Sequence, residues 1–319
     1  MITYIVLIVS LVGIVFGADW LVAGSVSIAR KFKVSDFVIG AAIVGVGTSM
    51  PELVVSFIGA LEGNSDVAIG NVVGSNIFNI LGILGITAIF FPIAISKENL
   101  KFEIPFNIFV CILIILLAMN FFNGTPASLN RPDGIILLII FGIFMWYSFH
   151  RDKIMKQLRN ETEEFKNIPL GPSVIRVLAG LAILITSCDF FVDNAVKLAK
   201  SFGVNDAFIS LTLIACGTSL PELAASIAAA RKKNTQLALG NIIGSNIFNA
   251  TLILGVSAQV MPLTSGGITI VDYLVMTAAA LIPLMLGIGS KIGRVSGFMM
   301  FFCFVGYTWY LLSNQLQLL

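Results

Sequence analysis

Ten apolar stretches of about 20 residues, the length that crosses the hydrocarbon core of a bilayer, follow one another along this chain. Inside a bilayer such a stretch has to satisfy its backbone hydrogen bonds internally, as a helix does. Apolar residues make up 57% of the 319 residues and charged residues only 11%, which excludes an ordinary soluble domain. The sequence therefore predicts an all-α polytopic membrane protein with ten transmembrane helices, at residues 3–27, 36–61, 66–91, 104–122, 132–149, 173–198, 206–230, 236–262, 269–289 and 295–314.

Basic residues gather on every second connection between these stretches. All but three of the 19 Lys and Arg residues, the exceptions being Arg131, Lys197 and Lys200, lie on the side reached after the first helix. Since cytoplasmic connections carry an excess of Lys and Arg, this side is predicted to be cytoplasmic and both termini extracellular. We expect a multi-pass protein of the cell membrane, surrounded by the lipid bilayer. A net charge of +2 gives no reason to expect a nucleic acid partner, and nothing in the sequence indicates an obligate protein partner.

The chain repeats itself after 170 residues. Residues 47–53, GTSMPEL, return as residues 217–223, GTSLPEL; residues 70–79, GNVVGSNIFN, return as residues 240–249, GNIIGSNIFN. Five predicted helices separate each element from its copy, and because five is odd the second copy lies inverted in the membrane. We therefore expect two inverted five-helix repeats, at residues 1–149 and 173–319, joined by a cytoplasmic linker at residues 150–172. Inverted repeats with a site near the bilayer midplane are common in secondary transporters.

Each copy of the first motif places a carboxylate inside a predicted span, Glu52 in one and Glu222 in the other. A charged residue near the centre of a transmembrane helix opposes insertion by about 2.5–3.5 kcal/mol, so such residues usually face a polar cavity and serve function. Pro51 and Pro221 lack an N–H and disrupt the helix beside the glutamates, which frees backbone carbonyls. A broken helix is tolerated at membrane depth where it lines a cavity, so the sequence predicts a cation site.

Polar side chains at helical spacing surround these glutamates. Thr48 and Ser56 share a helix face with Glu52, and the same pattern surrounds Glu222. The next helices add two polar stripes, formed by Asn71, Ser75 and Asn79 and by Asn241, Ser245 and Asn249. Four glycines between them are predicted to let helices approach closely: Gly70, Gly74, Gly240 and Gly244. Carboxylate, hydroxyl, amide and carbonyl oxygens suit hard cations, calcium best among them.

Other classes of protein fit the sequence less well. The four cysteines show no paired spacing and His150 is the only histidine, which argues against a disulfide framework or a zinc site. An intramembrane hydrolase would need a Ser/His pair, an HExxH motif or a catalytic Asp pair, and none is present. A passive cation channel remains an alternative, as does a proton-coupled antiporter. For Asp19 and its repeat copy Asp189 we favour structural pairing over a helix cap or a gating ion.

The two doubled motifs resemble the alpha repeats of the cation/calcium exchanger superfamily, most closely its prokaryotic sodium/calcium exchangers. The resemblance covers nearly the whole chain. It implies ten helices with external termini, no enzymatic activity, no cofactor, and calcium and sodium as the transported ions. It also implies four ion sites in a diamond, with calcium in the middle and sodium on the flanks. The first and sixth helices are similar to the family's sliding gate.

The resemblance also implies which residues bind the ions. The central ligands would be Glu52, Glu222, Asn79, Asn249 and the carbonyls of Thr48 and Thr218. The outlying sodium sites would use Ser49, Ser75, Ser219, Ser245 and the carbonyls of Gly45 and Ala215. Several relatives, potassium-dependent ones among them, have Asp where this chain has Asn249, so the expected centre carries two carboxylates and potassium co-transport is disfavoured. We expect a sodium/calcium antiporter, electrogenic if three sodium ions exchange for one calcium ion.

Overall fold

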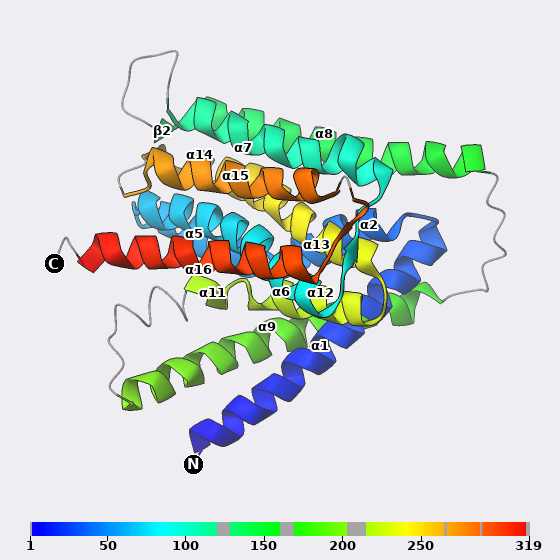
Figure 1. Ribbon diagram of the computed structural model, residues 1–319, viewed down its shortest axis with the longest axis horizontal. Coiled ribbons are helices and arrows are strands. Elements are labelled where there is room, and N and C mark those ends of the chain that lie inside the picture. The colour runs from blue at the N-terminus through cyan, green and yellow to red at the C-terminus, as the bar shows by residue number, and fades with distance from the viewer. Residues whose placement is uncertain are drawn as a thin grey trace.

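The computed structural model describes residues 2–119, 128–159, 169–202, 215–264, 267–287 and 289–316, and these residues are almost entirely helical (Figure 1). Labels with η mark π-helical segments. The first half contains α1 (Ile2–Phe32), α2 (Asp36–Ile39), η1 (Gly40–Gly45), α3 (Val46–Thr48), α4 (Met50–Leu61), α5 (Ser65–Ile77), η2 (Phe78–Leu84), α6 (Gly85–Phe90), η3 (Asn99–Glu103), α7 (Ile104–Ala118) and α8 (Arg131–Arg159). The second half contains α9 (Leu170–Ser201), α11 (Ala215–Gly217), α12 (Leu220–Arg231), α13 (Thr235–Phe248), η5 (Asn249–Ile253), α14 (Leu254–Val260), α15 (Ile270–Gly287) and α16 (Arg294–Leu316).

The apolar stretches of the sequence become long helices, as predicted. Within the described residues, eight helices are long and apolar enough to cross a membrane, at residues 3–32, 65–90, 99–118, 131–151, 170–201, 235–260, 270–287 and 294–313. A ninth candidate is the pair Asp36–Thr48 and Met50–Leu61, which are bent by 49° where they meet. The seventh predicted span, residues 206–230, is described only from residue 215 onward, where α11 and α12 lie. Residues 206–214, and residues 120–122 of the fourth predicted span, lie outside the described residues.

Several helices continue past the predicted transmembrane spans, and the fifth does so furthest. We expected the fifth helix to end at residue 149, but α8 continues to Arg159, inside the predicted linker. The apolar pattern marks only the part of a helix that faces lipid, and a helix can continue past it because its backbone hydrogen bonds are internal. The linker residues 160–168 lie outside the described part of the chain.

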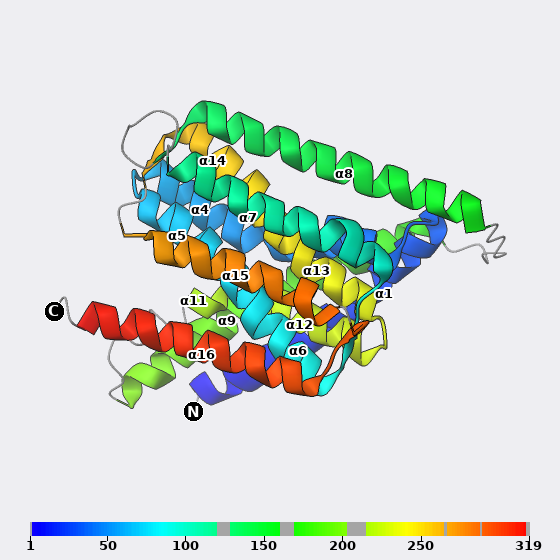
Figure 2. The same cartoon turned by 45° about the horizontal axis from the view of Figure 1, so that its top comes forward.

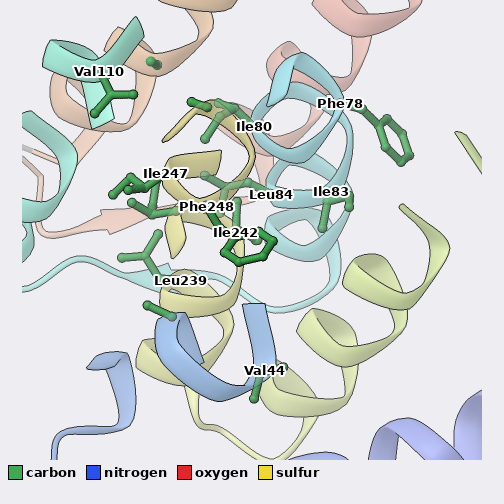
Figure 3. Packing of buried hydrophobic residues seen from close by; sticks show 14 of the residues in the cluster. Val44, Phe78, Ile80, Ile83, Leu84, Val110, Leu239, Ile242, Ile247 and Phe248 are labelled. Carbon is green, nitrogen blue, oxygen red and sulfur yellow. The ribbon is translucent and has the colours of Figure 1, made fainter. Parts of the chain in front are cut away.

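The centre of the protein is built from two repeat-related helices. In the most apolar 18-residue window of each span, 94% of the residues are buried in Thr235–Val260 and 83% in Ser65–Phe90, against 11% to 39% in the other six single-helix spans. Figure 3 shows the apolar side chains of α13 and η2 packing against one another. Since these two helices contact protein on nearly every side, they are the frame on which the other elements are held.

Close helix approach depends on glycine at α13. A Cβ added to Gly240 would lie 2.9 Å from the carbonyl carbon of Phe37, and one added to Gly244 would lie 3.1 Å from the Ala41 oxygen. The packing prediction is therefore confirmed for this pair, which lets α2 and η1 lie against α13. For Gly74 it stays a prediction: a Cβ there would meet no described atom within 4 Å, and residues 206–214, the repeat counterparts of residues 36–44, lie outside the described residues.

Helices α1 and α9 form a crossed pair beside the central bundle (Figures 1 and 2). A Cβ on Gly17 would lie 2.7 Å from the Leu184 nitrogen, so glycine is what permits this approach. The first residues of α1 and the last residues of α16 lie toward the same end of the molecule, opposite the C-terminal end of α8 (Figures 1 and 2).

Four two-residue strands, which the sequence analysis did not predict, tie the two halves together. Strand β1 (Ile93–Ala94) pairs antiparallel with β4 (Lys291–Ile292), and β2 (Ser128–Leu129) pairs antiparallel with β3 (Leu263–Thr264). β1 and β4 lie in the connections after the third and ninth predicted helices, both on the side predicted to be cytoplasmic. β2 and β3 lie in those after the fourth and eighth, both on the opposite side. Each strand pair thus joins two connections that the charge pattern places on the same side of the membrane.

Candidate functional site

Two broken helices bring the glutamates together in the interior. Helix α3 ends at Thr48, Ser49 leaves the helical conformation (φ −83°, ψ 10°), and α4 begins at Met50. Pro51 occupies the first turn of α4, where its missing N–H leaves no helical hydrogen bond unmade. The second half repeats this break at Ser219 (φ −92°, ψ 7°), just before α12. The predicted disruption beside the prolines is therefore present in both copies.

Hydrogen bonds cross between the two copies at this point. Ser49 Oγ donates to Glu222 Oε1 at 2.8 Å, and Ser219 Oγ donates to Glu52 Oε1, also at 2.8 Å. Both glutamates are buried, Glu52 at 1% exposure and Glu222 at 0%. Each carboxylate is thus held by the serine of the opposite half, and both are buried where the two repeats meet.

Several oxygens in this region lack a hydrogen-bond donor. Glu52 Oε2, Glu222 Oε2, Asn79 Oδ1 and Asn249 Oδ1 are buried and have no hydrogen-bond partner within the described structure. Leaving a buried polar atom unpaired costs about 1–3 kcal/mol, and more for a charged one, so native proteins rarely do it without a reason. Two carboxylate and two amide oxygens of this kind are a suitable ligand set for a hard cation.

A second group of candidate residues lies where η1 meets α13. Thr48 Oγ1 donates to Gly45 O at 3.4 Å and to Asn241 Oδ1 at 3.3 Å, and Ser245 Oγ donates to the same Gly45 carbonyl at 3.3 Å. Gly45 is the last residue of η1, while Asn79 and Asn249 lie in η2 and η5. Short π-helical segments inside longer helices are frequent at functional sites.

The remaining candidates are less closely connected. Ser75 is buried, and Thr218 is half-buried with its Oγ1 unpaired among the described atoms. Ala215 is the first described residue of α11, which positions only its backbone. The described chain thus brings together Ser49, Ser219, Glu52 and Glu222 directly, and Gly45, Thr48 and Ser245 beside them.

Sequence reasoning missed a pair of asparagines beside the site. Asn76 Nδ2 donates to the Asn246 carbonyl and Asn246 Nδ2 to the Asn76 carbonyl, both at 3.1 Å. Asn246 Oδ1 also accepts from Asn79 Nδ2 at 2.9 Å. The signal that could have found them was present, since both occur in the repeated GSN tripeptide and a carboxamide inside a span needs a partner.

Asp19 and its repeat copy Asp189 differ in their ion pairing. The Asp19 carboxylate pairs with Arg231 at 2.5 Å and with Lys232 at 3.2 Å, at the end of α12, which confirms structural pairing for this residue. Asp189 is exposed, and the repeat positions of the two cations hold Leu61 and Glu62. The ion pairs at Asp19 therefore have no equivalent in the other half.

Neutral oxygens are needed for any cation bound here. Within the described ranges, no group of three or more His, Cys, Asp or Glu side chains is placed to hold a metal ion. Two carboxylates alone leave most positions around a calcium ion open, since calcium takes six to eight oxygens. Hydroxyl, amide and backbone oxygens of the kind gathered around Glu52 and Glu222 would have to fill them.

Comparison with known proteins places these observations in a family. Residues 2–150 and 172–313 match the family model described as sodium/calcium exchanger protein. The chain is 32% identical to the sodium/calcium exchanger MaX1 of Methanosarcina acetivorans, an alignment that covers 96% of this chain and 97% of that protein. It is 37% identical to the inner membrane protein YrbG of Escherichia coli K12, covering 80% of this chain and 79% of that one.

The fold is also similar to a solved structure. The sodium-calcium exchanger NCX_Mj soaked with zero Na⁺ and Ca²⁺ matches with a TM-score of 0.80 and 32% identity, over 95% of this chain and 96% of that one. The same exchanger soaked with Na⁺ and Sr²⁺ matches with a TM-score of 0.80 as well.

Proposed function

This chain belongs to the sodium/calcium exchanger protein family, and we propose that it exchanges sodium for calcium across the membrane by alternating access. It is a multi-pass membrane protein and a transporter rather than an enzyme. One observation carries the proposal. Glu52 and Glu222, from opposite halves, are buried side by side through the crossed serine bonds, and each keeps one unpaired oxygen.

The proposal includes ten spans in two inverted repeats, residues 1–149 and 173–319, with the linker at 150–172. The paired bonds support it, because Ser49 to Glu222 and Ser219 to Glu52 are exchanged by a shift of 170 residues. The strand pairs support it too, since each joins connections expected on one side of the membrane. We place both termini outside the cell membrane, in accord with the basic residues on the opposite side.

The same residues provide a mechanism for coupling. Two ionised glutamates carry a charge of minus two, which one calcium ion or two sodium ions neutralise. Because both kinds of ion need the same carboxylates, they compete, and the empty, doubly charged site resists crossing the low-dielectric interior. Asn79 and Asn249 add oxygen without charge, so a third sodium ion would leave a net positive charge and make exchange electrogenic.

The proposed ligands are those expected from the sequence. The central calcium site would use Glu52, Glu222, Asn79, Asn249 and the carbonyls of Thr48 and Thr218, and the sodium sites would use Ser49, Ser75, Ser219, Ser245 and the carbonyls of Gly45 and Ala215.

Helices α1 and α9 are the proposed moving gate. Part of the space between them and α12 is an apolar cavity of about 300 Å³, and its lining includes Leu11, Phe191 and Leu220. A smooth apolar surface offers few directional bonds that would have to break during sliding. The ion pairs of Asp19 with Arg231 and Lys232 are the charged links across this boundary that the described chain contains.

Radiocalcium uptake into proteoliposomes tests the proposal. Vesicles loaded with sodium and diluted into sodium-free buffer should accumulate calcium, and Glu52→Gln or Glu222→Gln should abolish the uptake. Glu62→Gln is a matched control, because Glu62 is exposed at the end of α4 and should leave uptake unchanged. Near-normal uptake by both site variants would refute the site.

The same vesicles separate the alternatives. A proton-coupled antiporter would take up calcium when a pH gradient replaces the sodium gradient. A passive channel would conduct calcium with no counter-ion gradient at all. Either result would refute sodium/calcium exchange.

A further inference from the structure

Two asparagines outside the proposed ligand set bind the backbone of the two glutamates. Asn71 Nδ2 donates to the Glu52 carbonyl at 3.0 Å and to Ser56 Oγ at 2.9 Å. Asn241 Nδ2 donates to the Glu222 carbonyl at 3.1 Å and to Ser226 Oγ at 2.9 Å. The two sets of bonds are exchanged by the 170-residue shift and agree within 0.1 Å, so the arrangement is a feature of the repeat.

These bonds occur where the backbone is otherwise weakly fixed. The first turn of a helix lacks the constraint of preceding hydrogen bonds, and here it follows a residue in a non-helical conformation. The carbonyl of each glutamate, already an acceptor within its helix, receives a second donor from the neighbouring central helix. The first turn of α4 is thereby attached to α5, and that of α12 to α13.

The amide groups are oriented for this purpose. With one Nδ2 bonded to both a carbonyl and a hydroxyl, its two N–H groups are committed to protein oxygens. The amide oxygen of Asn241 also accepts from Thr48 Oγ1, at 3.3 Å. Asn241 therefore joins Glu222 of the second motif to Thr48 of the first. The repeat copy, Thr218 Oγ1, has no hydrogen-bond partner in the described part of the chain.

We propose that Asn71 and Asn241 are positioning residues, which fix the backbone of Glu52 and Glu222 so that both carboxylates can reach one cation. This inference rests on the proposed function. It assigns the role to the Nδ2 donor group, whereas the ligand residues act through oxygen. Substitutions that remove the amide Nδ2 group but keep an oxygen therefore distinguish positioning from ion binding.

Three variants of the full chain provide the test. Asn71→Ala and Asn241→Ala remove the donor, and Asn241→Asp replaces it by oxygen while adding a negative charge. We expect each to raise the KM for calcium in sodium-driven uptake about tenfold, with the maximal rate within about twofold of the unmutated protein. Calcium binding to the purified protein, measured by equilibrium dialysis with radiocalcium, should weaken by the same factor.

Asn241→Asp is the decisive variant. If Asn241 were an ion ligand through Oδ1, the added carboxylate would keep or strengthen calcium binding. If its donor group is what matters, Asp has to weaken binding as Ala does, because a carboxylate repels the Glu222 carbonyl. Calcium binding by Asn241→Asp as tight as that of the unmutated protein would overturn the inference.

One control and one milder test variant protect the experiment against a general loss of folding. Asn234→Ala removes an asparagine that caps the start of α13, where its side chain accepts from the Leu237 N–H at 3.1 Å, and it should leave calcium binding unchanged. Ser226→Ala removes one of the two acceptors of Asn241 with a smaller loss of packing, and we expect a two- to threefold rise in KM, a fraction of the effect of a lost hydrogen bond.

The possible results distinguish failure of the positioning role from failure of sodium/calcium exchange. Normal binding in the Asn→Ala variants, or in Ser226→Ala if those do not fold, overturns the positioning role and leaves exchange untouched. An unmutated protein that neither binds nor transports calcium refutes the proposed function and the inference with it.

Discussion

Two repeat-related glycines, Gly244 and Gly74, should respond oppositely to the same substitution. A Cβ on Gly244 would lie 2.5 Å from the Ala41 Cβ and 3.1 Å from the Ala41 oxygen, both on η1. Carbon atoms at van der Waals contact are about 3.5–4.0 Å apart, so α13 and η1 would have to separate by roughly 1 Å. A Cβ on Gly74 meets no described atom within 4 Å.

The expected change in the free energy of unfolding is the difference between two opposing effects. Overpacking a close helix contact costs about 1–3 kcal/mol, while Ala stabilises a helix interior by about 1 kcal/mol relative to Gly. Gly244→Ala should therefore lower the free energy of unfolding by up to about 2 kcal/mol, and Gly74→Ala should leave it unchanged or raise it by up to about 1 kcal/mol. Separation of α13 from η1 also moves Ser245 away from the Gly45 carbonyl, so Gly244→Ala should slow exchange as well.

Unfolding of the purified protein in mixed detergent micelles measures the first effect, and sodium-driven radiocalcium uptake measures the second. The two variants differ only in which half carries the extra methyl group, so each controls for the other. Equal stability and equal uptake in both variants would refute the close packing of α13 on η1.

Three further predictions concern charges, two of them outside the proposed pocket and the third the transported ions. Asp19→Asn should lower the free energy of unfolding by less than about 1 kcal/mol, because its partners Arg231 and Lys232 are partly exposed, and complete loss of uptake by a folded variant would instead indicate a gating ion. Arg151→Met should destabilise the protein by about 1–3 kcal/mol, because it removes the charged hydrogen-bond donor of the buried Glu103 carboxyl group, and adding Glu103→Gln should restore most of the loss in the same unfolding assay. Exchange of three sodium ions for one calcium ion should carry current, so a clamped voltage should change the rate of calcium uptake, whereas a voltage-independent rate would indicate neutral two-for-one exchange.

The helical framework was predictable because lipid imposes simple rules. A stretch of apolar residues long enough to cross a bilayer becomes a helix, and Pro51 and Pro221 mark where two helices break. The glutamates stand out because carboxylates are rare inside spans. Repetition in the sequence then places them in equivalent positions of two halves, which is why both were expected to contribute to one site.

The connections within the pocket could not be predicted, because they depend on how the halves pack. Nothing in the sequence pairs Ser49 with Glu222 rather than with Glu52, since that choice is made by tertiary geometry. The π-helical segments, the two strand pairs and the mutual bonds of Asn76 and Asn246 are likewise products of packing.

A structure of the protein soaked in calcium or strontium tests most directly whether Glu52 and Glu222 share one cation. We predict a single divalent ion bound by a carboxylate oxygen of each glutamate, at about 2.3–2.6 Å for calcium. An ion bound elsewhere, or coordinated by only one of the two glutamates, would contradict it.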